Sequence, residues 1–394
     1  MSQPAGVQIV RPVRDGLTWL SYSELSLWAW YLYAFGATVA LLRDDQRTSL
    51  TAAGLHGSVM AVSGIISGLF ASRLIEHLGR GPVLRLGTIG AIIGVSAYAW
   101  PGASYPVTLA GAFLSGLCGT LVIITLNAFL LHHQRAAGPA SLTEANALAA
   151  LAGLIGPLAV GLCATLVVGW RAGVLAVAVG LIIVEILRGR RTNDFGAPGA
   201  SEHAAHRSAP LPRRVYWSLL LIVCFLGTEF SVVFWSADLL RERASFGPAA
   251  AAASLAAVTG AMAIGRYVGS RLAERYALDT ILKWSVLIAL FGFALAWVTP
   301  VGWVMLLGMF VIGLGISVHW PIGVSRAVHA SGGMTDRASA LSSVWGSVAI
   351  ASAPLILGVA SEAFGFHLAF LIVPVLLIGA LAILFAKPDP TARP

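Results

Sequence analysis

Charged residues are scarce in this chain: only 11% of its 394 residues are charged, whereas 58% are hydrophobic. Its mean hydropathy of +0.84 lies well above the range of soluble globular domains. This scarcity of charge excludes a soluble globular fold and places the chain in a lipid bilayer.

Motifs for other kinds of chemistry are also lacking. The three cysteines, Cys118, Cys163 and Cys224, fall inside apolar stretches, with no CxxC or Cys/His spacing, so neither a disulfide framework nor a metal site is predicted. No GxxxxGK[ST] loop and no nucleophile–base spacing occurs, which argues against ATP-driven transport and against an enzyme. No polar segment interleaves basic and aromatic residues, so we expect no nucleic-acid partner and no cofactor.

Long apolar stretches make up most of the sequence. A helix needs ~20 apolar residues to cross ~30 Å of hydrocarbon. Strands are not expected, because an isolated strand in lipid would leave its backbone groups unpaired and the alternation of a β-barrel is absent. We therefore predict an all-α integral membrane protein with twelve transmembrane helices, at about 17–42, 51–75, 83–101, 106–131, 143–168, 172–188, 214–241, 249–273, 281–299, 302–328, 337–362 and 367–386.

The sequence repeats itself at half its own length. Leu41-Leu42-Arg43-Asp44 returns 198 residues later as Leu239-Leu240-Arg241-Glu242, and Ser72–Glu76 returns at the same offset as Ser270–Glu274. We therefore expect two pseudo-symmetric six-helix bundles, residues 1–188 and 214–394. In so apolar a chain, a duplicated half indicates a transporter whose site lies between the halves.

The distribution of positive charge predicts the orientation of the chain. Between the bundles, residues 189–213 form the one long polar segment, which is typical of a flexible linker. With both termini and this linker inside, 19 basic residues lie on the inner side or at adjoining helix ends and 5 lie outside. Positive charge concentrates on the cytoplasmic side of membrane proteins, so we expect both termini to be cytoplasmic, in the cell (inner) membrane.

The loop between the second and third apolar stretches resembles the signature loop of the major facilitator superfamily, G-x-x-x-D-R-x-G-R-[RK]. Gly79 and Arg80 match that pattern, and Glu76 replaces its aspartate; the second copy keeps Glu274 and Arg275 but lacks the Gly-Arg pair. The resemblance covers nearly the whole chain. It implies a monomer that carries a small molecule by alternating access, with helices 1, 4, 7 and 10 around a central cavity.

A role for the signature loop can also be argued from its residues alone. Gly79 permits a tight turn, and Glu76 lies within reach of Arg73 or Arg80. An ion pair at this point would latch the cytoplasmic side, with Glu274 and Arg275 as the counterpart in the second half. The alternative is a static pair that only caps the helix.

Ionisable residues inside the apolar stretches are the strongest functional candidates, because they are costly there and usually face a cavity or a partner. Glu24 shares a helix face with Trp28 and Tyr31, which suits proton exchange or a cationic or hydroxyl-bearing substrate; the alternative is a pair with a basic residue nearer the inner surface, such as Arg14.

Glu229 has no basic residue near it along its own helix, so its partner is another helix, water or a proton. Arg266 is the obvious candidate, and a direct pair with it would make Glu229 structural. Asp238, closer to the outer end of the same helix, is a further proton-coupling candidate. Protons are therefore expected partners.

Other candidates for the substrate cavity are single residues. His319, Trp320 and Pro321 combine a titratable group, an aromatic ring and a helix breaker. Arg266 follows Gly265 in a GxxxG pattern that is typical of close helix packing. Asn127 adds a hydrogen-bonding group, and Trp345 is either a gating or a packing residue.

The fifth apolar stretch bears on the direction of transport. Gly153, Gly156, Pro157 and Gly161 resemble the superfamily's antiporter motif, G-P-x-x-G-G, with Val160 in place of one glycine. The resemblance favours proton-driven efflux of a small organic molecule. Two alternatives remain: the motif is a generic packing seam, or the protein is a proton-coupled symporter that imports a sugar or similar nutrient.

Overall fold

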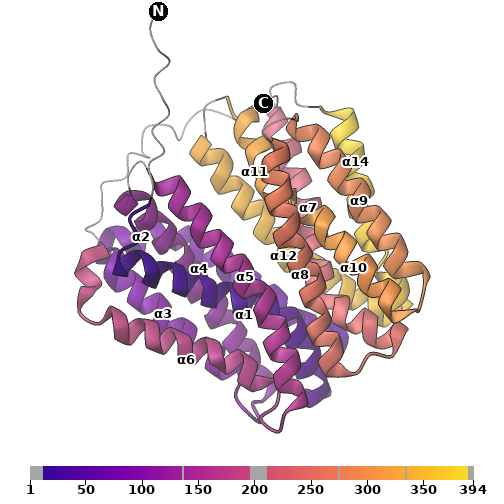
Figure 1. The fold of residues 1–394 in the computed structure, drawn as a ribbon, viewed down its shortest axis with the longest axis horizontal. Helices are drawn as coiled ribbons and strands as arrows, with labels where there is room; N and C mark the ends of the chain where they lie inside the picture. Colours follow the sequence, from indigo (N-terminus) through magenta and orange to yellow (C-terminus); the bar gives the residue numbers. More distant parts are fainter. Residues whose placement is uncertain (1–11, 135–136, 196–210, 274–275, 333–334, 389–394) are drawn as a thin grey trace, which may run out of the picture.

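The structure is a computed structural model that describes residues 12–134, 137–195, 211–273, 276–332 and 335–388 (Figure 1). Within these ranges the regular elements are all helical. The first half contains α1 (Gly16–Gln46), α2 (Leu50–Leu78), α3 (Arg80–Tyr98), α4 (Tyr105–Gln134), α5 (Gly138–Thr165), α6 (Arg171–Arg188) and a short 3-10 helix, η2 (Arg191–Phe195). The second half contains α7 (Arg213–Ala244), α8 (Pro248–Ala273), α9 (Leu278–Val298), α10 (Gly302–Ile316), α11 (His319–Ala330), α12 (Thr335–Phe364), α13 (Phe366–Ala369) and α14 (Ile372–Ala386).

The helices agree closely with the predicted spans. Among the described residues, 11 segments are long and apolar enough to cross a membrane. The remaining predicted span is α6, which is helical but carries Arg171, Glu185 and Arg188. The tenth predicted span is divided into α10 and α11, and the twelfth comprises α13 and α14. The all-helical, twelve-span prediction is therefore confirmed.

Two groups of helices, α1–α6 and α7–α14, lie side by side (Figure 1). The first helix of each is the most enclosed: 72% of the most apolar part of α1 and 78% of that of α7 is buried. In contrast, α3, α6, α9 and α14 expose apolar side chains such as Ile93, Ile186, Phe291 and Phe385. The enclosed pair is therefore where polar side chains of the two halves can meet, and the peripheral helices present the surface suited to lipid.

The molecule has two ends: a termini face, where α1 and α7 begin and α6 and α14 end, and a distal face, where α1 and α7 end. Toward the distal face the halves approach so closely that glycine is needed. A Cβ atom on Gly36 of α1 would lie 2.3 Å from the carbonyl oxygen of Val233 in α7, and one on Gly161 of α5 would lie 2.7 Å from the Cβ of Ala253 in α8. Figure 1 shows the halves meeting in the lower part of the view and diverging toward the upper part.

Trp235 closes the distal contact. Its side chain is 1% exposed, and its indole N–H donates a 2.9 Å hydrogen bond to the carbonyl oxygen of Pro354 in α12. The ring lies against Gly54 of α2 and Gly358 of α12. One aromatic residue of α7 thus packs at the junction of both halves, which are joined at the distal face.

Candidate functional site

A break in the tenth span creates an unusual polar position inside the helical bundle. The chain leaves α10 at Ile316 and resumes helical structure in α11 at His319. Pro321 explains this break, because it has no N–H to donate to the carbonyl of Ser317, four residues earlier, and its ring clashes with that carbonyl. The Ser317 carbonyl oxygen accepts a 3.4 Å hydrogen bond from Nε of Arg266 in α8 instead.

Arg266 lies close to this break because α8 has small residues where it faces the break. A Cβ atom on Gly265 would lie 2.3 Å from the Ser317 hydroxyl, and one on Gly269 would lie 2.2 Å from a Val318 methyl. The close packing predicted from the GxxxG pattern is therefore present. It brings the Arg266 guanidinium to the carbonyl that Pro321 leaves free.

Tyr33 connects this position to the other half of the molecule. Nη2 of Arg266 donates a 3.2 Å hydrogen bond to the Tyr33 hydroxyl, which joins α8 to α1. The Tyr33 ring is seated on Gly153 of α5, where a Cβ atom would approach it to 2.7 Å. Arg266 is thus oriented by two neutral oxygens, one from each half.

Glu229 of α7 is the acidic member of the site. It is 4% exposed, and no hydrogen bond or direct ion pair to it occurs within the described ranges. Arg266 is near enough to act on it electrostatically but not in contact. The direct pair that would have made Glu229 structural is therefore absent from this conformation.

His319 lies at the start of α11, two residues after Ser317. Its side chain is fully buried, both ring nitrogens lack a hydrogen-bond partner among the described residues, and its ring stacks on Phe225 at 4.1 Å between centroids. Phe225 precedes Glu229 by one helical turn on α7, on the same face. Glu229, Arg266, His319 and Tyr33 are hereafter called the central site.

Glu24 lies outside the central site. It is fully buried, contacts Arg188 of α6 directly and accepts a 2.5 Å hydrogen bond from the Thr88 hydroxyl of α3. Arg188 also binds Glu185 at 2.5 Å. The basic partner suggested from the sequence, Arg14, instead pairs with Glu144 at 2.8 Å. Glu24 therefore faces the interior of the first bundle.

The remaining cavity candidates are distributed over several helix contacts. Tyr31 shares a 3.1 Å hydrogen bond with Ser115 of α4, and Trp28 packs on Gly119 of the same helix. Trp320 packs against Gly346 of α12, next to half-buried Trp345. Asn127 is half-buried on α4. Among the described residues, no hydrogen bond, ion pair or ring contact joins these side chains to the members of the central site.

Ion pairs join the two halves at the distal face. Arg43 of α1 pairs with Asp238 of α7 at 2.7 Å, and Arg241 of α7 pairs with Asp44 of α1 at 2.5 Å. Arg43 and Arg241 are equivalent residues of the internal repeat, so the duplicated sequence meets itself across the interface. These four residues are hereafter called the distal latch. Glu362 of α12 adds a 2.8 Å hydrogen bond from the Thr51 backbone N–H of α2.

The sequence and the helical fold are both matched by known proteins. Residues 25–331 match the model of the Major Facilitator Superfamily. The chain belongs to this superfamily. It is therefore an integral membrane transporter for a small-molecule substrate and not an enzyme. No curated protein sequence shows significant similarity to it.

Solved structures resemble this superfamily member over nearly its whole length. A mutant of the nucleoside transporter NupG is 12% identical, with a TM-score of 0.77 over 95% of this chain and 99% of that one. A bacterial homolog of the human lysosomal transporter Spinster, inward-facing and unoccupied, is 13% identical, with a TM-score of 0.76 over 94% of this chain and 96% of that one. At these identities the likeness concerns the fold alone.

The superfamily's signature loop lies at the termini face of the transporter. Gly79 adopts a φ of 83° between α2 and α3, as the tight turn requires. Glu76 is exposed and Arg80 half-buried, and within the described ranges no ion pair joins Glu76 to Arg73 or Arg80. Glu274 and Arg275 lie outside the described residues. A cytoplasmic latch at this loop therefore remains a prediction for the conformation in which the halves meet at this face.

The antiporter-like motif of α5 has a definite packing role. Gly153 seats Tyr33, and Gly156 accommodates Trp30, whose carbonyl oxygen would lie 2.7 Å from an added Cβ. Gly161 packs on α8 of the second half, and Pro157 lies inside the helix. The motif thus supports one member of the central site and the junction of the two halves.

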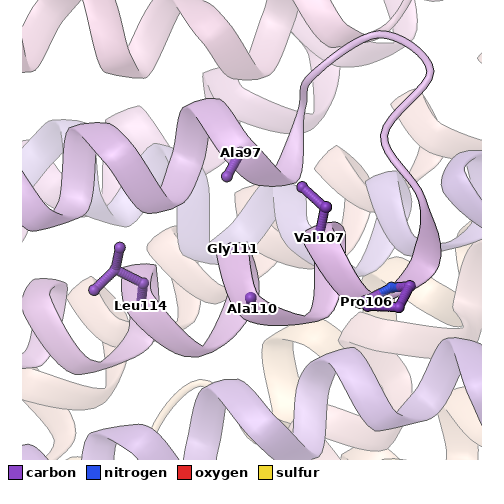
Figure 2. A pocket seen from close by; sticks show the side chains of 6 residues that line it. All are labelled: Ala97, Pro106, Val107, Ala110, Gly111 and Leu114. Atoms are coloured by element: carbon purple, nitrogen blue, oxygen red, sulfur yellow. The ribbon is translucent and has the colours of Figure 1, made fainter.

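Figure 2 shows a separate, shallow groove between α3 and α4 near the distal face. Its lining is entirely apolar: Ala97, Pro106, Val107, Ala110, Gly111 and Leu114. It offers no polar side chain to orient a substrate, so the central site is the better candidate for transport.

Three features of the central site and of the interface between the halves were not predicted from the sequence. Tyr33 was not predicted, because nothing in the sequence links it to Arg266. The Ser317 carbonyl could have been predicted from Pro321, which has no N–H to bond it. The repeat contains Arg43 and Arg241, but only the tertiary structure shows that each pairs with an aspartate of the other half.

Proposed function

We propose that the transporter moves a small organic molecule out of the cell by alternating access, coupled to proton movement at Glu229. Both termini lie on the cytoplasmic side of the cell membrane in this proposal, so the distal face is external. Among the distal basic residues, Arg43, Arg171 and Arg241 are paired with Asp238, Asp45 and Asp44. The unbalanced positive charge therefore lies at the termini face, as expected for the cytoplasmic side.

The observation that carries the proposal is the state of Glu229. A buried carboxylate inside a membrane span is costly to keep charged unless a counter-ion touches it. Glu229 has Arg266 nearby but no direct partner among the described residues, and it belongs to α7, which packs against both α1 and α8. Glu229 can therefore be balanced either by the nearby charge of Arg266 or by a proton, so its protonation would depend on what else binds beside it.

Alternating access needs contacts that break and reform, and the distal latch supplies them. Four charged side chains hold the distal face closed, while the halves diverge toward the termini face (Figure 1). Opening the distal face would separate Arg43 from Asp238 and Asp44 from Arg241. In this proposal a shift of proton or substrate at the central site biases that opening.

The direction of flux rests on the α5 motif, whose resemblance to antiporters favours efflux. A second mode, in which proton and substrate move together, is favoured by the separation of Glu229 from Arg266, since each can then bind its own partner. The two modes differ in the sign of proton movement on substrate binding, and symport would suit import as well.

The deciding experiment measures proton movement when substrate is added to purified transporter in weakly buffered detergent. Lipophilic cations, sugars and organic acids form the panel. Proton release on binding indicates antiport, and uptake indicates co-transport; either must vanish in Glu229→Gln. Binding with no proton movement in the native transporter would refute proton coupling.

A further inference from the structure

We infer that the substrate carries an acidic group that binds Arg266, and that a proton accompanies it on Glu229. This inference rests on the second mode of the proposed function, in which proton and substrate move together, and it names the substrate class of the same site. It arises from how Arg266 is held, compared with the other arginines inside the helical bundle.

Buried arginines elsewhere in the transporter touch carboxylates. Arg188 contacts Glu24 and Glu185, and Arg326 binds Asp279 at 2.7 Å. These pairs neutralise the charge within the protein and lock the side chains in place. Their guanidinium groups are committed to structural roles.

Arg266 is arranged differently. Its two described hydrogen bonds go to neutral oxygens, the carbonyl of Ser317 through Nε and the hydroxyl of Tyr33 through Nη2. Its Nη1 makes no hydrogen bond within the described ranges, and its side chain is only half-buried. The guanidinium is thus oriented without a carboxylate in direct contact among the described residues, so an anion can bind to it. A guanidinium fork binds carboxylate or phosphate oxygens in a bidentate manner more favourably than neutral groups.

Charge balance selects an acid over a base. With Glu229 ionised and Arg266 charged, the empty site has no net charge. A bound cation would leave one uncompensated positive charge in a medium of low dielectric constant, which is costly. An anion bound to Arg266 together with a proton on Glu229 keeps the site neutral. Substrate anion and proton therefore bind cooperatively.

His319 adds a second polar group to the site. Both of its ring nitrogens lack partners among the described residues, although the ring is fully buried and stacked on Phe225. A buried polar group normally has a hydrogen-bond partner. A hydroxyl or amide on the substrate would satisfy His319 while the acidic group binds Arg266.

The test compares ligands that differ in one group. Butyrate, lactate, benzoate and salicylate are titrated against the purified full-length transporter, beside butyramide, lactamide, benzamide, salicylamide and the matching amines, with proton uptake recorded. We expect at least one acid to bind with proton uptake and its amide and amine to bind at least tenfold more weakly. Preferred binding of amides or amines, or failure of every acid in the panel, overturns the inference.

Two variants separate this inference from the proposed function. Arg266→Gln should weaken binding of the acid about 100-fold, since it removes one member of a desolvated charge pair. Arg271→Gln, an exposed arginine on the same helix, is the matched control and should change nothing. Glu229→Gln imitates the protonated acid, so it should keep acid binding and make that binding independent of pH.

Unchanged binding in Arg266→Gln overturns the anion site even where proton coupling stands. Acid binding without proton uptake in the native transporter instead refutes proton coupling and leaves the anion site intact. Loss of acid binding in Glu229→Gln contradicts the assignment of the proton to Glu229. A folded Arg266→Lys variant that binds acid more tightly than Arg266→Gln guards against misfolding as the cause.

Discussion

Glu24 and Glu229 are both buried carboxylates on the first helix of their half, yet their surroundings differ completely. Glu24 touches Arg188 and accepts a hydrogen bond from Thr88, so three helices of one bundle hold it. Glu229 lies within electrostatic reach of Arg266 of α8, whose hydrogen bonds go to Ser317 and Tyr33 instead. Similar sequence contexts thus produce a structural ion pair in one half and, in the other, an acid with no direct partner among the described residues.

The difference shows that an ionisable residue inside a membrane span is not functional by itself. What matters is whether a counter-ion from another helix reaches it. Arg188 is close enough to neutralise Glu24 permanently, whereas Arg266 is restrained by neutral acceptors. The comparison predicts opposite responses to mutation in the two halves.

The largest effect is expected at Glu229. Glu229→Gln removes the titratable proton but keeps the shape and the hydrogen-bonding groups of the side chain, so proton-coupled transport should be abolished while thermal stability in detergent remains unchanged. Proton flux in liposomes with an imposed pH gradient measures the proton-coupled transport. Glu24→Gln is the variant with which Glu229→Gln is compared. Coupling that survives in Glu229→Gln removes this residue from the mechanism.

At the paired acid the effect should fall on stability. Arg188→Met leaves Glu24 buried without its main counter-ion, which typically costs about 3–5 kcal/mol. The double variant Glu24→Met/Arg188→Met should recover most of this loss, because an apolar pair needs no counter-ion. Unfolding monitored in mixed micelles provides the free energies. An Arg188→Met variant as stable as the native protein would contradict the importance of the ion pair.

Breaking the distal latch should shift the conformational equilibrium rather than stability. Arg43→Gln removes an ion pair from the closed distal face, and we expect about a tenfold shift toward the distal-open state. Spin labels at Arg47 and Glu242, both exposed, would report the distance across this face. Arg43→Asp combined with Asp238→Arg should restore closure, and failure of this swap to do so would argue against the pair.

The break in the tenth span can be repaired by one substitution. Pro321→Ala returns an N–H that can bond the Ser317 carbonyl, so α10 and α11 should join and Arg266 should lose one of its two acceptors. We expect several-fold weaker substrate binding and a small gain in thermal stability. Unaltered affinity would mean that the free carbonyl does not position Arg266.

The smallest effect concerns the start of α1, outside the membrane span. Asp15 caps this helix by accepting a 2.8 Å bond from the Thr18 N–H and pairs with His133 at 2.6 Å. Partial burial acts to raise the pKa of Asp15, but the hydrogen bonds from Thr18 and His133 outweigh it and lower the pKa. The stability it adds is therefore present above the unfolded pKa of about 3.9 and is lost as the pH falls through the lower folded value.

Asp15→Ala should accordingly cost about 1 kcal/mol at neutral pH and less in strong acid, where the protonated carboxyl retains only a neutral cap. Asp15→Asn keeps the cap without the charge, so it separates the two contributions. Melting temperatures measured from pH 3 to pH 7 test this, and an acid-independent difference between the native protein and Asp15→Ala would contradict the lowered pKa.

Much of the candidate site was foreseeable. Glu229, Arg266 and His319 were singled out because ionisable groups inside apolar spans are costly, and Gly265 and Gly269 predicted the close packing that brings Arg266 to the helix break. The partner of Glu24 was not foreseeable. Arg188 follows it by 164 residues and sits at a helix end, where it read as one more positive charge of the cytoplasmic side.

The sequence by itself determined the membrane spans, their number and the duplication, because the length and composition of an apolar stretch decide whether it spans a membrane. It also identified the ionisable side chains within those stretches, which are costly to bury in a membrane span. Only the tertiary structure decided which of them are neutralised, since Arg188, Tyr33 and Asp44 meet their partners across different helices. Electrostatic interactions between such groups depend on distances of a few ångströms. The periodicity of one helix does not predict the distance from its side chains to those of another helix.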